Sequence, residues 1–163
     1  MRRLPVGLLV LGLAVPLAAC GQDRFEAYCE RVEEHQVALT EAVAEGGPDA
    51  LLGVLPRLQD ISEAAPRDVT DEWQQVVGRL EALEAALEEA GVDAADYDRA
   101  EPPAGLADAD RAAIDGAARE LVRPTTVAAL QSVETQVRDV CGTPLYQGPR
   151  AGPTRAGALP PAE

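Results

Sequence analysis

The stretch Thr70–Val92, TDEWQQVVGRLEALEAALEEAGV, decides the fold of this chain. Its large apolar residues recur every three or four positions, which places them on one face of an α-helix; they are Trp73, Val76, Val77, Leu80, Leu83 and Leu87. Asp68 or Thr70 can cap the start of this helix. Gly91 followed by Val92 is typical of a Schellman ending. A helix with one apolar face needs helical partners to bury it.

Two stretches before Thr70 show the same helical spacing. The first, 24–45, has a stripe made of Phe25, Cys29, Val32, Gln36, Leu39 and Val43. The second, 48–65, has one made of Leu51, Val54, Leu55, Leu58, Ile61 and Ala65. Pro56 falls inside the second stretch, where proline removes a backbone hydrogen bond and clashes with the preceding turn. The sequence therefore predicts a kink or break near Gly53–Leu55.

The chain after Val92 is less regular. Residues 93–105 predict a short helical turn and a loop, and 107–122 a weaker helix carried by Ile114, Ala117 and Leu121. A break at Pro124 precedes a final helix that is predicted to bury Val127, Leu130, Val133, Val137, Val140 and Cys141. Residues 143–163, rich in Pro, Gly and Ala, predict a disordered tail. No run favours a strand, so we expect an all-α, up-and-down bundle of about four main helices plus short ones.

The first 20 residues have the pattern of an export signal. Arg2 and Arg3 precede an apolar run, Val6–Val15, which is shorter than the roughly 20 residues of a membrane span. The run leads to Leu17-Ala18-Ala19-Cys20, which resembles the lipobox of bacterial prolipoproteins. The resemblance implies that residues 1–19 are removed and that Cys20 carries a lipid anchoring the protein to the extracytoplasmic face of the cell membrane. The alternative is an ordinary secretory signal with an incidental cysteine.

Composition limits the partners. Removing residues 1–19 leaves 12 arginines against 28 acidic residues, a net charge of −16, and the chain has no lysine. Such a surface repels nucleic acid and anionic lipid head groups. We therefore expect no nucleic-acid partner, and a membrane contact made through the lipid on Cys20.

The other two cysteines predict the topology. Exported proteins seldom leave thiols unpaired, which favours a Cys29–Cys141 disulfide over two free buried thiols. A linker at 20–23 reaches at most about 14 Å, so the helix after it starts near the membrane. The disulfide returns the last helix to the same end. Four alternating helices satisfy both conditions, with Val92–Arg123 as the crossover at the far end.

Few residues suggest chemistry. Trp73 and Gln36, a polar residue in an apolar stripe, are candidates for facing a ligand, although a core tryptophan and a satisfied buried amide are the simpler interpretations. His35 is the only histidine, and zinc sites need several histidine or cysteine ligands. Trp73, Tyr97 and Tyr146 are candidates for an interaction surface. No catalytic motif, metal site or cofactor is predicted.

The irregular acidic segment is the candidate partner surface: Asp93, Asp96, Tyr97, Asp98 and Glu101. Its acids also suit Ca²⁺ by ligand type, although the spacing is not that of an EF-hand loop.

Three functions follow from these residues. The first is a non-enzymatic interaction or accessory module of the cell envelope, which would meet another exported or envelope protein through Asp93–Gly105. The second is a carrier of a small apolar or amphipathic ligand between helices near Gln36 and Pro56, and the third and least supported is an envelope enzyme. The domain, 24–142, resembles the small helical lipoproteins of GC-rich bacteria in its Cys29 and its Cys141-Gly142 ending. That likeness is too general to transfer a function.

Overall fold

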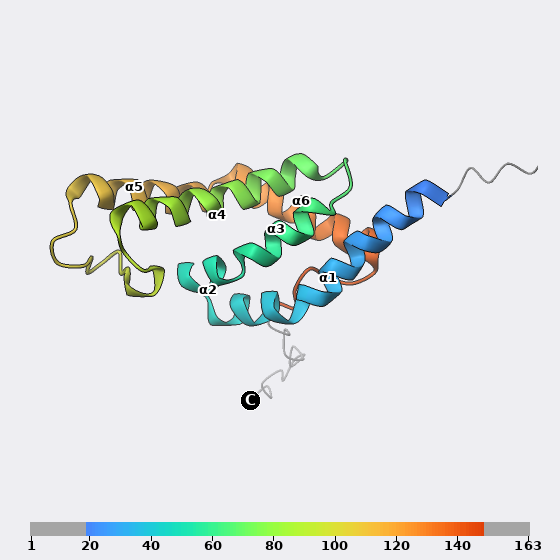
Figure 1. Ribbon diagram of the computed structural model, residues 1–163, viewed down its shortest axis with the longest axis horizontal. Helices are drawn as coiled ribbons and strands as arrows, with labels where there is room; N and C mark the ends of the chain where they lie inside the picture. The colour runs from blue at the N-terminus through green and yellow to red at the C-terminus, as the bar shows by residue number, and fades with distance from the viewer. Residues whose placement is uncertain (1–18, 149–163) are drawn as a thin grey trace, which may run out of the picture.

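The computed structural model describes residues 19–148 as helices joined by short connections (Figure 1). The helices are α1 (Ala19–Glu45), α2 (Pro48–Gly53), α3 (Leu55–Glu63), α4 (Thr70–Ala90), the 3-10 turn η1 (Ala94–Asp96), α5 (Asp108–Leu121) and α6 (Pro124–Cys141). Residues 19–148 contain no strand, which confirms the all-α class. Within the same range no helix is both long and apolar enough to cross a bilayer. The predicted signal segment up to residue 18 and the tail from 149 onward lie outside the described residues.

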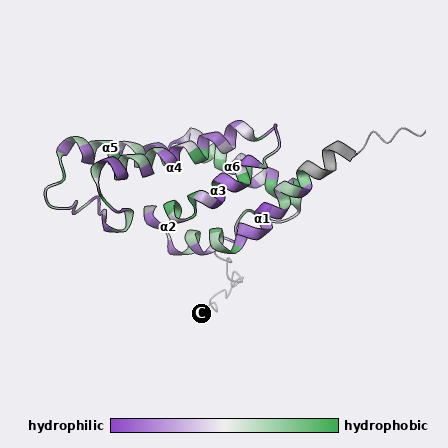
Figure 2. Ribbon diagram, viewed as in Figure 1, coloured by the Kyte–Doolittle hydropathy of each residue, from purple (hydrophilic) through white to green (hydrophobic). Residues whose placement is uncertain are grey.

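The helices form four columns that alternate in direction. α1 is the first column, α2 and α3 together are the second, α4 is the third, and α5 and α6 together are the fourth (Figure 1). α4 contacts α3, α5 and α6, while α1 contacts α2, α3 and α6. Hydrophobic and hydrophilic residues alternate along the helices, as amphipathic elements of a bundle require (Figure 2).

Two parts of the predicted topology are wrong. The segment Val92–Arg123 is more than a crossover, because α5 packs along the second half of α4 and buries Ile114 against Leu83 and Leu87. The expected linker 20–23 is also absent, because α1 already begins at Ala19. The residues that form α5, and residues 20–23 at the start of α1, contain no proline or paired glycine that would have prevented helix formation.

The predicted helix ends follow local backbone chemistry. α2 and α3 are separate helices that meet at Val54, just before Pro56, so the predicted break is confirmed. At the end of α4, Gly91 has a φ of 65°, and the amide of Val92 donates to the carbonyl oxygen of Leu87 at 3.0 Å. This pair of features is the predicted Schellman ending.

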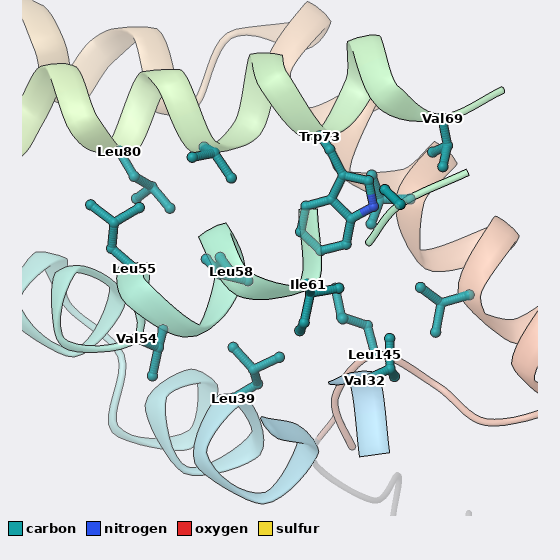
Figure 3. Close-up of a cluster of buried hydrophobic side chains, with 14 of the residues drawn as sticks. Val32, Leu39, Val54, Leu55, Leu58, Ile61, Val69, Trp73, Leu80 and Leu145 are labelled. Carbon is teal, nitrogen blue, oxygen red and sulfur yellow. The ribbon is translucent and has the colours of Figure 1, made fainter. Parts of the chain in front are cut away.

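The first core lies between α1, α3, α4 and α6 around Trp73, which is 1% exposed (Figure 3). The Trp73 Nε1–H donates to the Tyr28 hydroxyl oxygen at 3.0 Å, and the two rings meet edge to face at 6.5 Å. All six predicted apolar residues of α4 are buried. A second, smaller core joins α4 to α5 around Leu83, Leu87 and Ile114.

The predicted stripes of α1 and α6 are only partly correct. On α1 the buried residues are Tyr28, Val32, Leu39 and Ala42, whereas Phe25 and Val43 are exposed. On α6, Val127 and Val140 are exposed, and the face turned inward includes Thr126 and Ala129. Small and amphipathic residues fill these faces where the neighbouring helix comes close, and apolar spacing alone does not reveal them.

The Cys29–Cys141 disulfide is present, with the two Cα atoms 5.3 Å apart, and it joins α1 to the end of α6. The predicted tail begins too early. Residues 142–148, which we name the C-terminal strap, return across α1, and Leu145 is buried in the first core with 2% exposure. Burial of this one side chain, beside the disulfide, explains why the strap packs instead of extending into solvent.

Candidate ligand-binding cavity

An apolar cavity of about 220 Å³ lies where the four columns and the strap meet. Its lining comes from every column: Leu39, Ala42, Val43, Leu51, Val54, Leu58, Val76, Leu80, Leu121, Val122, Thr126, Val127, Leu130, Leu145 and Tyr146. Figure 3 shows Leu39, Val54, Leu58 and Leu80 on the facing surfaces of α1, α3 and α4. The cavity is therefore part of the bundle interior and not a surface groove on one helix.

Two helix breaks explain why the interior is not filled here. Val54 lies at the break between α2 and α3, and Val122 at the break between α5 and α6, and both residues line the cavity. Pro56 and Pro124 follow these breaks within the first helical positions, where proline is tolerated but cannot continue a preceding helix. Where two neighbouring columns are both interrupted at the same level, their side chains cannot interdigitate as closely as those of two continuous helices.

The cavity opens to water through an apolar mouth, which we define as Val43, Leu51, Val122 and Val127. These side chains are between 36% and 74% exposed. At the closed end, Leu80 and Leu145 are only 4% and 2% exposed. A molecule in the cavity would therefore have one end in the core and the other end at the surface.

The polar groups in the lining are already engaged within the protein. The Thr126 hydroxyl donates to the Glu120 carbonyl oxygen at 2.9 Å, and the Tyr146 hydroxyl donates to the Glu134 carboxylate. Burial, together with the hydrogen bond to Glu134, raises the pKa of the Tyr146 phenol to about 12. Tyr146 is thus neutral near pH 7, and the cavity lining carries no formal charge.

Gln36 holds the strap and does not line the cavity. Its Nε2 donates to the Thr143 hydroxyl oxygen at 2.8 Å and also to the Pro144 carbonyl oxygen. One turn along α1, the Thr40 hydroxyl oxygen accepts from the Gln147 amide at 2.9 Å. Gln36 is therefore a structural amide whose hydrogen bonds are made to the strap, which was the simpler of its two interpretations. Its indirect role is to place Leu145 and Tyr146 as the non-helical wall of the cavity.

Trp73 also lies outside the cavity lining. Its ring is enclosed by the first core, and its only polar group donates to Tyr28. Trp73 therefore does not face a ligand in this cavity, because it lies about two turns of α4 away from Leu80, although both side chains are on the same buried face of the helix. Tyr28, its hydrogen-bond partner, was not indicated by the apolar spacing of α1.

The acidic segment at the far end is a structured loop. The Asp93 carboxylate accepts from the Ala95 amide at 2.9 Å, and the Asp98 carboxylate accepts from the Ala100 amide at 2.7 Å. Tyr97 packs against the second core and donates to Asp115 at 3.1 Å. Asp96 and Glu101 are exposed. Two of the four predicted surface acids therefore stabilise turns of their own loop.

A polar cluster between α1 and α3 was not indicated by the sequence. Asp60 is contacted by Arg31 and by His35, whose Nε2 lies 2.7 Å from a carboxylate oxygen, and both contacts, His35 first, lower the pKa of Asp60. Glu34, His35 and Asp60 each offer a ligand atom within 4.8 Å of the others. Because Arg31 already neutralises Asp60, this arrangement is an ion pair that joins α1 to α3.

Comparisons of the chain with protein families, curated sequences and solved structures return no match. The assignment of a function therefore depends on the cavity and on the residues that surround it.

Proposed function

We propose that the protein is a lipoprotein, tethered through Cys20 to the extracytoplasmic face of the membrane, that binds a small apolar or amphipathic ligand in its cavity. The observation that carries this proposal is the cavity itself: about 220 Å³, lined almost entirely by aliphatic side chains, with a mouth of four exposed aliphatic residues. Exposed apolar side chains that gather around an opening are typical of binding sites.

The size of the cavity sets the size of the buried group. An apolar cavity of roughly 150 Å³ accepts a benzene ring, so about 220 Å³ is suited to roughly six to eight carbon atoms. Burial contributes about 0.8 kcal/mol per methylene, which gives about 5 to 6 kcal/mol. We therefore expect a dissociation constant on the order of 0.1 mM for such a group alone.

The interaction module centred on Asp93–Gly105 is less well supported. The Asp93 and Asp98 carboxylates are bonded to their own loop, and the side chain of Tyr97 packs inward. An enzymatic function has still less support, because the aliphatic lining offers neither a nucleophile nor a charged acid or base.

Methyl-resolved NMR tests the binding proposal. The mature chain, residues 20–163 with Cys20→Ser to keep it soluble, is titrated with 1-octanol. We expect saturable shifts of the Leu80 and Leu145 methyl groups. Val76→Phe fills the cavity and should abolish the shifts, whereas Val37→Phe, at a site 67% exposed outside the cavity, should preserve them. Absence of saturable shifts in the unmodified cavity would overturn the proposal.

Mass spectrometry of the protein recovered from its own membrane tests the tether. We expect a mature N-terminus at Cys20 that carries the added mass of a lipid. A mature chain with an unmodified Cys20 would overturn this part of the proposal and leave the cavity unaffected.

A further inference from the structure

The C-terminal strap closes the seam between α1 and α6 at the inner end of the cavity. On α1, the strap is hydrogen-bonded to Gln36 and to Thr40. On α6, it is bonded to Glu134 through the Tyr146 hydroxyl. Leu145 lies between these attachments in the chain and is only 2% exposed. The strap therefore bridges the two helices and places the Leu145 side chain in the seam between them.

The exposure of the lining rises with distance from the strap. On α1, it increases from 4% at Leu39 to 37% at Val43. On α6, Val127 lies about 10 Å along the helix axis from the attachment of the strap and is 41% exposed. Val122, in the break before α6, is 74% exposed. The cavity therefore has a direction, with its buried end at Leu145 and its open end in water.

The chemistry of the lining restricts what can reach the buried end. The hydroxyl groups of Thr126 and Tyr146 both donate to other atoms of the protein. Beside Leu80 and Leu145, a polar atom would lose its hydrogen bonds to water, because aliphatic side chains offer no replacement. A volume of about 220 Å³, suited to roughly six to eight carbon atoms, holds one alkyl chain and not two. The buried part of the ligand is therefore one hydrocarbon chain.

From these observations, and resting on the proposed function, we infer that the ligand is a single-chain amphiphile bound with its hydrocarbon end toward Leu145, and that Leu145 limits the length of chain that is buried. The polar head group stays in water outside the mouth. The Leu145 side chain fills the part of the seam into which a longer chain would extend. A smaller side chain at this position lengthens the cavity, and a larger one shortens it.

Straight-chain alcohols from 1-butanol to 1-dodecanol measure this limit. Each is titrated into the mature chain with Cys20→Ser. Every additional buried methylene should lower the dissociation constant roughly fourfold. The gain should end at about eight carbon atoms, the number that the cavity volume accepts. Carbon atoms beyond that number remain at the mouth in contact with water and add little affinity.

Two substitutions of Leu145 should move the limit in opposite directions. Leu145→Ala removes roughly three carbon atoms from the wall, so the limit should rise to about ten or eleven. Leu145→Phe adds roughly three, so the limit should fall to about five or six. A general loss of stability cannot produce both shifts. The control, Leu83→Ala, truncates a leucine that is also 2% exposed but belongs to the second core and not to the cavity lining, and it should leave the limit unchanged.

Nuclear Overhauser contacts between ligand and protein show which end of the ligand is buried. In the complex with 1-octanol, the terminal methyl group should contact the methyl groups of Leu145. The methylene beside the hydroxyl should contact Val127 or Val122 at the mouth. The reverse pattern, or equal contacts of both ends with Leu145, would overturn the proposed direction of binding.

Failure of this inference is distinguishable from failure of the proposed function. If 1-octanol does not bind to the wild-type cavity, the proposed function fails. If 1-octanol binds and the limit is the same in both Leu145 variants, the proposed function stands and the role of Leu145 is overturned. An equal shift in Leu83→Ala would also overturn it. If the Gln147 amide of Leu145→Ala has lost its hydrogen bond to Thr40, the strap has moved, and the direction of the shift in Leu145→Phe decides.

Discussion

The Cys29–Cys141 disulfide should contribute a large part of the stability of this domain. The perturbation is the double replacement Cys29→Ala and Cys141→Ala, made with Cys20→Ser so that no thiol remains. The bond closes a loop with a sequence separation of 112. Closing a loop of that length lowers the conformational entropy of the oxidised unfolded chain. This loss stabilises the folded state by about 4.8 kcal/mol at 25 °C. Native domains are stable by only about 5 to 15 kcal/mol.

Urea unfolding followed by tryptophan fluorescence measures this loss directly. Trp73 is the only tryptophan and is almost fully buried, so its emission reports the first core. With a urea dependence of about 1.5 to 2.5 kcal/mol per molar, the midpoint should fall by about 2 to 3 M. Reduction of the wild-type bond should give nearly the same loss, which separates the bond from the effect of the alanine side chains.

The reasoning would be refuted by a loss below about 1 kcal/mol in both the variant and the reduced protein. That result would mean that the unfolded chain already keeps α1 near α6, so the bond removes little entropy. A large loss in the variant with none on reduction would instead assign the effect to the packing of the two side chains.

Three further changes have defined outcomes. Tyr28→Phe leaves the buried Trp73 Nε1–H without its acceptor and should cost about 1 to 3 kcal/mol in urea unfolding; a cost near zero would contradict the bond. Leu145→Ala removes the buried side chain of the strap and should cost about 2 to 4 kcal/mol, measured by circular dichroism during thermal unfolding; no cost would mean that the strap does not pack. Because the pKa of Asp60 is lower in the folded protein than its ordinary value, the ionised carboxylate stabilises the fold at pH values above the ordinary carboxyl pKa. This stabilisation is lost as the pH falls through the lowered pKa. Asp60→Asn should therefore be less stable than wild type at pH 7, with the difference shrinking in acid; a constant difference would exclude the ion pair.

The helices were predictable where large apolar residues alone define a face. α4 is the clearest case, because Trp73, Leu80 and Leu87 leave one orientation that buries all three. On α1 the same reasoning chose Phe25 over Tyr28. The choice depends on a tertiary partner, since Tyr28 is buried by its contact with Trp73 45 residues later. The spacing of apolar residues within α1 gives no information about that partner.

The cavity could be anticipated only in part. Pro56 and Pro124 mark two breaks in the sequence, but nothing in the sequence places the breaks at the same level in adjacent columns. The strap was missed for a related reason. Leu145 is a single large apolar residue among proline, glycine and threonine, so it forms no periodic pattern, and its burial depends on Gln36 and on the disulfide.

The continuity of α1 from Ala19 changes how a lipid on Cys20 would act mechanically. A flexible four-residue linker would let the domain reorient freely relative to the bilayer. A helix that begins at the attachment point is a stiff rod, with about 35 Å of rise between Cys20 and Val43. The cavity would then stay at a fixed distance from the attachment point, whatever angle the helix makes with the bilayer. A molecule that delivers or receives the ligand would therefore have to come within about 35 Å of the attachment point to meet the opening.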